Sequence, residues 1–477
     1  MERVGTSTRM TAKRRGSMLT DRLSGAFHSA QAEIDRGPIY PEATAEEIRN
    51  HLARYDFGEA MPLEEAAANV EEMLRRWQVQ VTHPRYFGLF NPSVRLASVV
   101  ADSLTAIYNP QLAAWRTAPA AIEIERHTLA WLAGKFGLPA ATVASFTSGG
   151  AEANLSAIVT GLTHFFPEYG EKGLHRLPSP PAFYASSEAH HSLNKIAHMT
   201  GLGRDAVRVI PAGKDLKMDV GALAVAVEQD RKNGLAPFLV VGTAGSTAAG
   251  AVDPLPELAD FCRRERLWFH VDAAWGGAAI VSPSLRRHLA GIEHADSITC
   301  DAHKWFSVAM GCGMFFCRHP QTVARAFRAD TSYMPRTAGA DTTDPYTHSV
   351  QWSRRFAGLK LFLTLAELGE AGLAATIDHQ TRMGDRLRDR LAASGWKIVN
   401  DTPLPVICFT REDIDLPAFL GALRARQICW MSEARLAGVS VIRACITSFK
   451  TTEQEIDQVV EQITLLAAEQ KGSPVTC

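Results

Sequence analysis

The sequence predicts an α/β protein with a mostly parallel β-sheet, an N-terminal helical arm and a smaller C-terminal α/β domain. Two observations predict the sheet. Short apolar segments alternate with helical segments between about residues 120 and 330, and these apolar segments are almost uninterrupted. Strands of this kind are buried on both faces, as in a parallel sheet covered by helices. In addition, the length of 477 residues exceeds one domain at roughly 150 residues per domain.

Composition and charge exclude several classes of protein. Hydrophobic residues make up 46% of the chain, and 50 Lys and Arg residues are balanced by 51 Asp and Glu residues. The formal net charge of -1 argues against a nucleic-acid partner, which requires clustered basic charge. No segment has the roughly 18 uninterrupted apolar residues of a membrane span. We therefore expect a soluble protein without a membrane partner.

The cysteines and the N-terminus predict a cytoplasmic protein. The 8 cysteines are scattered, without a CxxC pair or zinc-site spacing to a histidine. We expect buried free thiols in a reducing compartment, and no metal. The first 20 residues are basic but lack the hydrophobic core of a secretory signal, and we expect them to be disordered.

Three domains are predicted along the chain: a helical arm at residues 1–80, a large domain at 81–365 and a small α/β domain at 366–477. In the arm, apolar residues from Thr44 to Trp77 recur at helical spacing, and Pro62 is expected to open a second helix. The other predicted helices are Ser93–Tyr108, Val220–Asn233, Leu255–Glu265, Gly358–Ser394 and one opened by Thr451 and Thr452.

Short apolar runs bounded by turn residues predict the strands. In the large domain these are Ala182–Ala185, Val207–Pro211, Pro237–Gly242, Leu267–Asp272, Ser297–Asp301 and Met314–Cys317. In the small domain they are Trp396–Asn400, Leu404–Thr410 and Ser440–Thr447.

Two residues at predicted strand ends are candidates for chemistry. Asp272 ends an apolar strand, and ligands of open α/β sheets bind at the carboxyl ends of strands. An acid that only caps a turn is the alternative. Lys304 follows the next strand, between His303 and Trp305. Partial desolvation there would make its amine nucleophilic, as covalent catalysis with a carbonyl group requires.

A third candidate is Thr147–Asn154, in which small residues precede an apolar helical run. Backbone amides exposed by glycine at a helix N-terminus form a phosphate site, although Gly-Gly pairs are also common in structural turns. Together with Asp272 and Lys304, this segment completes the three contacts that pyridoxal phosphate needs: a phosphate cradle, an acid for the ring nitrogen and an amine.

Several segments occur in the order and spacing of a known family. They are Ala118–Glu125, Thr147–Asn154, Ala185–His190, Thr243–Thr247, His270–Gly277, Asp301–Trp305 and Ser353–Lys360. Together they resemble the group II pyridoxal-phosphate-dependent amino acid decarboxylases, which include the aromatic-amino-acid, glutamate and cysteine-sulfinate enzymes. The resemblance covers most of residues 80 to 450, and it implies the fold of the type I pyridoxal-phosphate-dependent transferases.

The resemblance also implies roles for individual residues. Lys304 would bind pyridoxal 5'-phosphate covalently, Asp272 would pair with the protonated ring nitrogen, and His190 would stack on the ring. The other implied cofactor contacts are Ala274, Thr243, Gly149, Gly150, Ala151 and His303. Asp301 stands where some members carry Asn, and its role is open.

The implied reaction is decarboxylation of an L-amino acid to the amine and carbon dioxide, after the substrate amine displaces Lys304 from the cofactor. Tyr333 matches a tyrosine on a mobile loop and would protonate the substrate Cα. In the family this loop reaches the neighbouring subunit's site, which implies a homodimer. A tyrosine here rather than phenylalanine favours the amine over the aldehyde-forming branch.

The substrate signal is mixed. The resemblance places Phe90, Gln111 and Arg116 near the substrate side chain. Phe90 suits an aryl group, whereas Gln111 and Arg116 could bind a second carboxylate or a sulfinate. For Arg116, a cation at a helix start that pairs with a nearby acid is the alternative. We expect an aromatic substrate, with an acidic amino acid as the alternative. An aminotransferase or aldehyde synthase on the same fold, and a scaffold without activity, are further alternatives.

Overall fold

The computed structural model describes residues 12–329 and 342–472, and it contains a large and a small β-sheet. The large sheet has 7 strands in the order β1-β7-β6-β5-β4-β2-β3. Strand β7 is antiparallel to both of its neighbours, and every other pairing is parallel. The bounds are β1 Val143–Thr147, β2 Pro181–Ser186, β3 Val207–Ile210, β4 Ala236–Thr243, β5 Trp268–Asp272, β6 Ser297–Asp301 and β7 Gly313–Cys317. The predicted mostly parallel sheet is confirmed.

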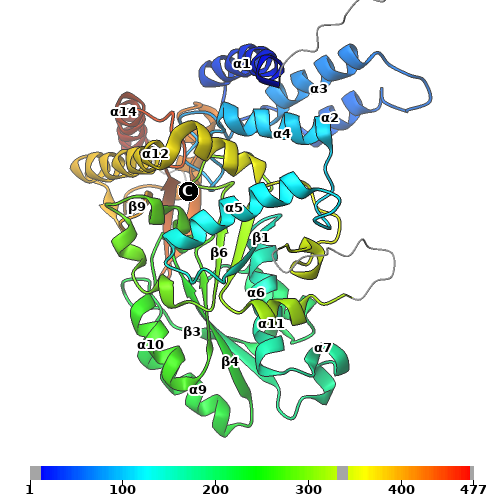
Figure 1. Ribbon diagram of the computed structural model, residues 1–477. Coiled ribbons are helices and arrows are strands. Elements are labelled where there is room, and N and C mark those ends of the chain that lie inside the picture. The colour runs from blue at the N-terminus through cyan, green and yellow to red at the C-terminus, as the bar shows by residue number, and fades with distance from the viewer. Residues whose placement is uncertain (1–11, 330–341, 473–477) are drawn as a thin grey trace, which may run out of the picture.

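Helices cover both faces of the large sheet. On one side lie α6 (Gly150–Phe165), α8 (Ser192–Met199) and α11 (Pro320–Ala326), and on the other lie α9 (Val220–Lys232) and α10 (Leu255–Glu265) (Figure 1). The strands are buried between these layers, which explains their continuous apolar sequence. A short helix, α7 (Tyr169–Lys172), follows α6.

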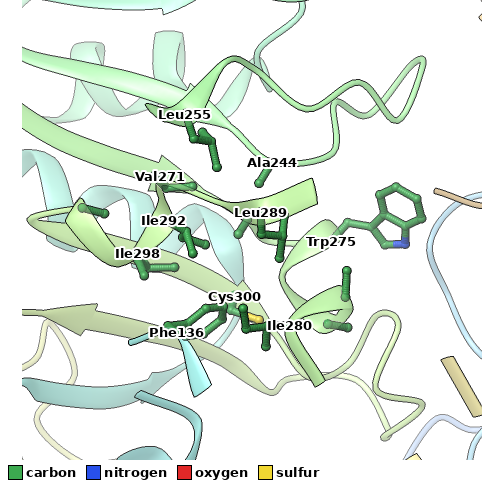
Figure 2. Packing of buried hydrophobic residues seen from close by; sticks show 14 of the residues in the cluster. Phe136, Ala244, Leu255, Val271, Trp275, Ile280, Leu289, Ile292, Ile298 and Cys300 are labelled. Atoms are coloured by element: carbon green, nitrogen blue, oxygen red, sulfur yellow. The ribbon is translucent and has the colours of Figure 1, made fainter. Parts of the chain in front are cut away.

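Core packing holds the carboxyl ends of the central strands in place. Val271 of β5 and Ile298 and Cys300 of β6 are fully buried in one cluster, together with Leu289 and Ile292 from the connection between these strands (Figure 2). Such close packing fixes the strand ends, so the residues that follow Asp272 and Asp301 start from rigid positions.

The N-terminal region is helical and corrects one prediction. Helix α1 spans Ala12–Arg36, so residues 12–20, which we expected to be disordered, lie in a helix. Its half-buried Leu19, Leu23 and Phe27 recur at the spacing of one helical face, and the helix packs against α4. The basic residues Lys13, Arg14 and Arg15 just before them hid this pattern. The other helices before the sheet are α2 Ala45–Leu52, α3 Leu63–Trp77, α4 Leu96–Tyr108 and α5 Pro119–Lys135.

A long helix connects the large sheet to the small one. Helix α12 runs from Leu359 to Ala393 with a kink at Gly369, where φ is 62°. Its first half packs in the core of the large sheet, and its second half packs in a separate core under the small sheet. The predicted boundary between residues 365 and 366 falls just before this kink, and it stays a prediction.

The small sheet has 4 strands in the order β10-β11-β9-β8, and all of its pairings are antiparallel. Its elements are β8 Lys397–Ile398, β9 Val406–Thr410, α13 Leu416–Ala425, β10 Ser432–Leu436, β11 Val439–Cys445 and α14 Glu453–Gly472. Among the described helices of the whole chain, none has the length and apolar character that crossing a membrane requires.

Candidate active site

Three parallel strands end side by side at one edge of the large sheet. Thr243 ends β4, Asp272 ends β5 and Asp301 ends β6, and Thr243 is directly paired with Asp272 in the sheet register. The turn after β6 then carries Lys304. The sheet topology therefore gathers these side chains at its carboxyl edge, where open α/β sheets bind their ligands.

A cavity of about 330 Å³ lies at this edge, within the size range of small-molecule sites. Ten of the residues predicted from the sequence line it: Phe90, Gly149, Gly150, Ala151, His190, Thr243, Asp272, Ala274, His303 and Lys304. The structure adds Ser148, Glu152, Asn154, Gly245, Thr247, Trp275 and Asp301.

Lys304 and Asp301 form an ion pair inside the cavity. The Lys304 Nζ lies 3.1 Å from Asp301 Oδ2 and 5.8 Å from the centroid of the Phe90 ring. The Asp301 side chain is 1% exposed, and its Oδ1 has no hydrogen-bond partner among the described residues. The lysine amine is thus held by one buried acid, next to an aromatic wall.

Asp272 is buried and accepts two hydrogen bonds. Asn154 Nδ2 donates to Oδ2 over 2.8 Å, and the Ala274 backbone N–H donates to Oδ1 over 3.1 Å. Both donors stabilise the charged carboxylate, which is the form that pairs with a protonated ring nitrogen. Asp272 thus caps the turn at Ala274 and also lines the cavity.

The glycine segment forms a close-fitting loop before α6. Glu152 Oε2 accepts hydrogen bonds from the backbone N–H and the hydroxyl of Ser148, which fixes the loop. A Cβ atom at Gly150 would lie 3.0 Å from Asp301 Oδ2 and 3.1 Å from the Ala274 Cβ. The first backbone amides of this 16-residue helix therefore face the cavity without side-chain cover, as a phosphate requires.

Two histidines contribute neutral imidazoles. His190 lies exposed at the cavity rim, and its Nδ1 accepts a hydrogen bond from the Ser192 N–H over 3.2 Å. His303 is buried, and its Nδ1 accepts from the Cys312 N–H over 3.1 Å. Desolvation is the main cause that lowers the pKa of each histidine. Both rings therefore carry their proton on Nε2 near neutral pH.

Two predicted residues are not brought together with the others. Gln111 and Arg116 are exposed and lie outside the cavity, and Gln111 Nε2 donates to Ser353 Oγ over 2.9 Å. Tyr333 lies outside the described residues. Among the additions, Asn154 was within a recognised segment but had no signal of its own, because its role depends on a partner on another strand.

The sequence of the chain matches a known family of enzymes. The model of the family described as "Pyridoxal-dependent decarboxylase conserved domain" matches residues 54–412 of the chain. The chain belongs to this family. The resemblance to the group II decarboxylases is thereby confirmed, together with the cofactor, pyridoxal 5'-phosphate, and the enzyme class, a carboxy-lyase that acts on amino acids.

Individual relatives differ in substrate. The chain is 29% identical to an aromatic-L-amino-acid decarboxylase of Bacillus atrophaeus, over 82% of each protein. It is 32% identical to an acidic amino acid decarboxylase of Bos taurus, over 70% of this chain and 64% of the relative. A crystal structure of Catharanthus roseus tryptophan decarboxylase in complex with L-tryptophan has a TM-score of 0.87 at 21% identity, covering 97% of this chain and 100% of that one. This last likeness supports the fold.

The residues of the cavity fit this cofactor. The bare amides at Gly149 and Gly150 suit a phosphate, the buried Asp272 suits a ring nitrogen, and the Lys304 amine suits an aldehyde carbon. The hydroxyl oxygen of Thr243 is buried without a hydrogen-bond partner in the described part of the chain, so it has a free position toward a ligand.

Proposed function

We propose that the chain decarboxylates an aromatic L-amino acid to the corresponding amine and carbon dioxide. One observation carries this proposal: the Lys304 amine, the Asp272 carboxylate and the bare amides of the glycine loop converge on one cavity of about 330 Å³. When bound, the cofactor supplies an electron-accepting ring that takes up the charge released as the carboxylate leaves.

The roles of the protein groups follow from their chemistry. Lys304 would hold the cofactor through its amine. Asp272 would pair with the ring nitrogen and favour its protonated form, and the neutral His190 at the rim would contact the ring. Tyr333, which lies outside the described residues, is proposed as the proton donor to Cα on the grounds of the resemblance alone.

The cavity wall supports an aromatic substrate. Phe90 lines the cavity and stacks on Trp275, with ring centroids 4.5 Å apart, and Trp275 stacks on Trp305. Phe90 and Trp275 thus contribute apolar aromatic side chains to the cavity wall, which suits an aromatic substrate.

Arg443 is a candidate for the substrate α-carboxylate, although it is not one of the residues that line the cavity. Its side chain is buried and lies over the Phe90 ring, with Cζ 4.8 Å from the ring centroid. Nε and Nη1 donate to the backbone carbonyls of Thr247 and Gly88, and Nη2 has no partner among the described residues. A buried guanidinium without an acidic partner is strongly stabilised by a carboxylate ligand.

An acidic amino acid is the second candidate substrate. Arg116 is exposed, so its charge is available to a second carboxylate. It lies outside the cavity of a single chain, and it would have to be supplied by a neighbouring subunit. Arg116→Ala should then reduce turnover of acidic substrates and leave aromatic substrates unaffected.

We also propose that the protein acts as a cytoplasmic homodimer with active sites at the subunit interface. Helices α2 and α3 have no buried residues, and Phe57, Leu63, Ile107 and Tyr108 expose between 63% and 90% of their surface. Large apolar side chains exposed in this way support an interface with another subunit.

The test is a panel of carboxyl-labelled amino acids: Tyr, Trp, Phe, Dopa, Glu, Asp and cysteine sulfinate. We expect labelled carbon dioxide and equimolar amine from the aromatic members, and no product from Lys304→Ala. Formation of a keto acid would instead indicate an aminotransferase, and formation of aldehyde, ammonia and peroxide would indicate an aldehyde synthase. Release of carbon dioxide from Glu, Asp or cysteine sulfinate alone would favour the acidic alternative.

A further inference from the structure

We propose that Asn154, held by His270 and Thr299, is a positioning residue that fixes the Asp272 carboxylate for the ring nitrogen of the cofactor. This inference rests on the role of Asp272 in the proposed function. It concerns a chain of buried side chains beneath the cavity, of which only Asn154 and Asp272 line the cavity itself.

The chain of hydrogen bonds runs through the sheet from β5 to α6. Trp268 Nε1 donates to Ser297 Oγ over 2.8 Å, and Ser297 Oγ lies 2.9 Å from His270 Nδ1. His270 Nε2 lies 3.0 Å from Asn154 Oδ1, and Asn154 Nδ2 donates to Asp272 Oδ2 over 2.8 Å.

The chemistry of each group sets the direction of these bonds. His270 is completely buried, and burial lowers the pKa of its imidazole to about 4, so the ring carries one proton near neutral pH. A proton on Nε2 is donated to Asn154 Oδ1, while Nδ1 accepts from the Ser297 hydroxyl. The other tautomer could donate to the Ser297 carbonyl oxygen at 3.1 Å, but it would turn a lone pair toward the asparagine oxygen.

Asn154 therefore has one favourable amide orientation. Thr299 Oγ1 donates to Asn154 Oδ1 over 2.6 Å, in addition to His270. The opposite orientation would place the amide oxygen 2.8 Å from a carboxylate oxygen, with two acceptors in contact. With its oxygen held by two donors, the asparagine presents its NH₂ group to Asp272.

Helix α6 thereby organises both ends of the cofactor site. It begins at Gly150, whose loop suits the phosphate, and Asn154 lies one turn further along the same helix. The same rigid element then sets the distance between the phosphate site and the acid that meets the ring nitrogen. Asn154 and Thr299 are 1% and 0% exposed, so packing holds both of them in place.

The test separates positioning of Asp272 from a merely structural role. The full-length apoprotein is titrated with pyridoxal phosphate and with 1-deaza-pyridoxal phosphate, which lacks the ring nitrogen. Asn154→Leu removes the amide at similar volume. We expect about a tenfold loss of affinity for pyridoxal phosphate, because the Asp272 carboxylate loses the donor that holds it toward the ring nitrogen. We expect less than a twofold change for the deaza compound, because it has no ring nitrogen for Asp272 to meet.

The matched control is Thr160→Val on the same helix, which removes a buried hydroxyl that donates to the Ser156 carbonyl, away from the cavity. It should leave the preference between the two compounds unchanged. Equal losses of both compounds in Asn154→Leu, or no loss of either, would overturn the inference. If Asn154→Leu does not fold, Thr299→Val removes one donor to Asn154 Oδ1, and it should show the same selective loss at about twofold.

Asp272→Ala separates this inference from the proposed function. If this variant keeps the wild-type preference for pyridoxal phosphate over the deaza compound, the assigned role of Asp272 is wrong. If it loses that preference while Asn154→Leu and Thr299→Val keep it, the role of Asp272 stands and the positioning role of Asn154 is wrong.

Discussion

The Asp301 carboxylate lies close both to the Lys304 amine, which it attracts, and to the loop that suits a phosphate, which it would repel. Its Oδ2 pairs with the Lys304 amine, yet it would also lie 3.0 Å from a Cβ at Gly150, in the loop that suits the phosphate. The ion pair must be given up when the lysine binds the cofactor, and the carboxylate repels a phosphate dianion. Both effects oppose cofactor binding, and an amide at this position would remove both.

We therefore expect Asp301→Asn to bind pyridoxal phosphate roughly fivefold more tightly than the wild type, the scale of one partly screened charge interaction. Titration of the apoprotein, with inorganic phosphate as a competitor, measures the change. Phosphate should also compete more effectively in the variant. Weaker binding of both would show that the acid is needed to place Lys304.

Gly313 shows a steric requirement at the same site. A Cβ at this position would lie 2.5 Å from both the Gly149 Cα and the Thr147 Oγ1, so β7 can pass the glycine loop only with glycine. Gly313→Ala should displace the loop, weaken cofactor binding about tenfold and cost about 1–3 kcal/mol of unfolding free energy. Gly134→Ala, whose Cβ would meet nothing within 4 Å, is the control. Unchanged affinity in Gly313→Ala would mean that the loop tolerates the shift.

At the scale of the element, strand β5 carries a histidine whose protonation state affects folding. The pKa of His270 is lowered from 6.5 to about 4 by burial, so the native state binds fewer protons than the unfolded state between these pH values. Its contribution is complete above pH 6.5 and is lost as the pH falls toward 4, by up to about 3 kcal/mol. His83 adds a similar effect, while the raised pKa of Asp253, about 6, opposes it.

We expect His270→Gln to flatten this dependence. Urea unfolding of the apoprotein at pH 7 and pH 4.5 should show a smaller loss of stability in the variant than in the wild type. His83→Gln is a matched comparison, because its pKa is lowered to the same value in a different part of the fold. A wild-type pH dependence in His270→Gln would show that this histidine does not set the slope.

Elements with a strong local pattern were predictable from the sequence, and those defined by their partners were not. Helix α10 has the predicted bounds, Leu255–Glu265, because its apolar face and terminal residues are local signals. Strand β10, Ser432–Leu436, alternates polar residues at the edge of the small sheet and was missed. Strand β1 was missed because Val143–Thr147 is short and contains Ser and Thr. The cofactor residues followed from the family segments, whereas Asn154 and Gly313 depend on neighbours distant in sequence.

At the scale of the whole molecule, helices α2 and α3 bury none of their residues within the described part of the chain. Helices α1 to α3 extend beyond the body of the protein at the end nearest α4 (Figure 1). Phe57 is 90% exposed, Leu63 is 83% exposed, and Ile107 and Tyr108 at the end of α4 are 63% and 74% exposed. Exposure of these side chains to water is unfavourable, and covering them with the same surface of a second chain would stabilise both chains.

In sedimentation analysis we therefore expect the native protein to have twice the 52.0 kDa mass of one chain. We expect Ile107→Asp to dissociate to monomers, because it would bury a charge in the interface. Val225→Asp on α9 is the control, since Val225 is 68% exposed but lies on a helix that packs against the large sheet. If the neighbouring subunit completes the active site, the monomeric variant should bind pyridoxal phosphate with reduced affinity and lose turnover. A dimer that persists in Ile107→Asp, or a fully active monomer, would show that these helices serve another contact.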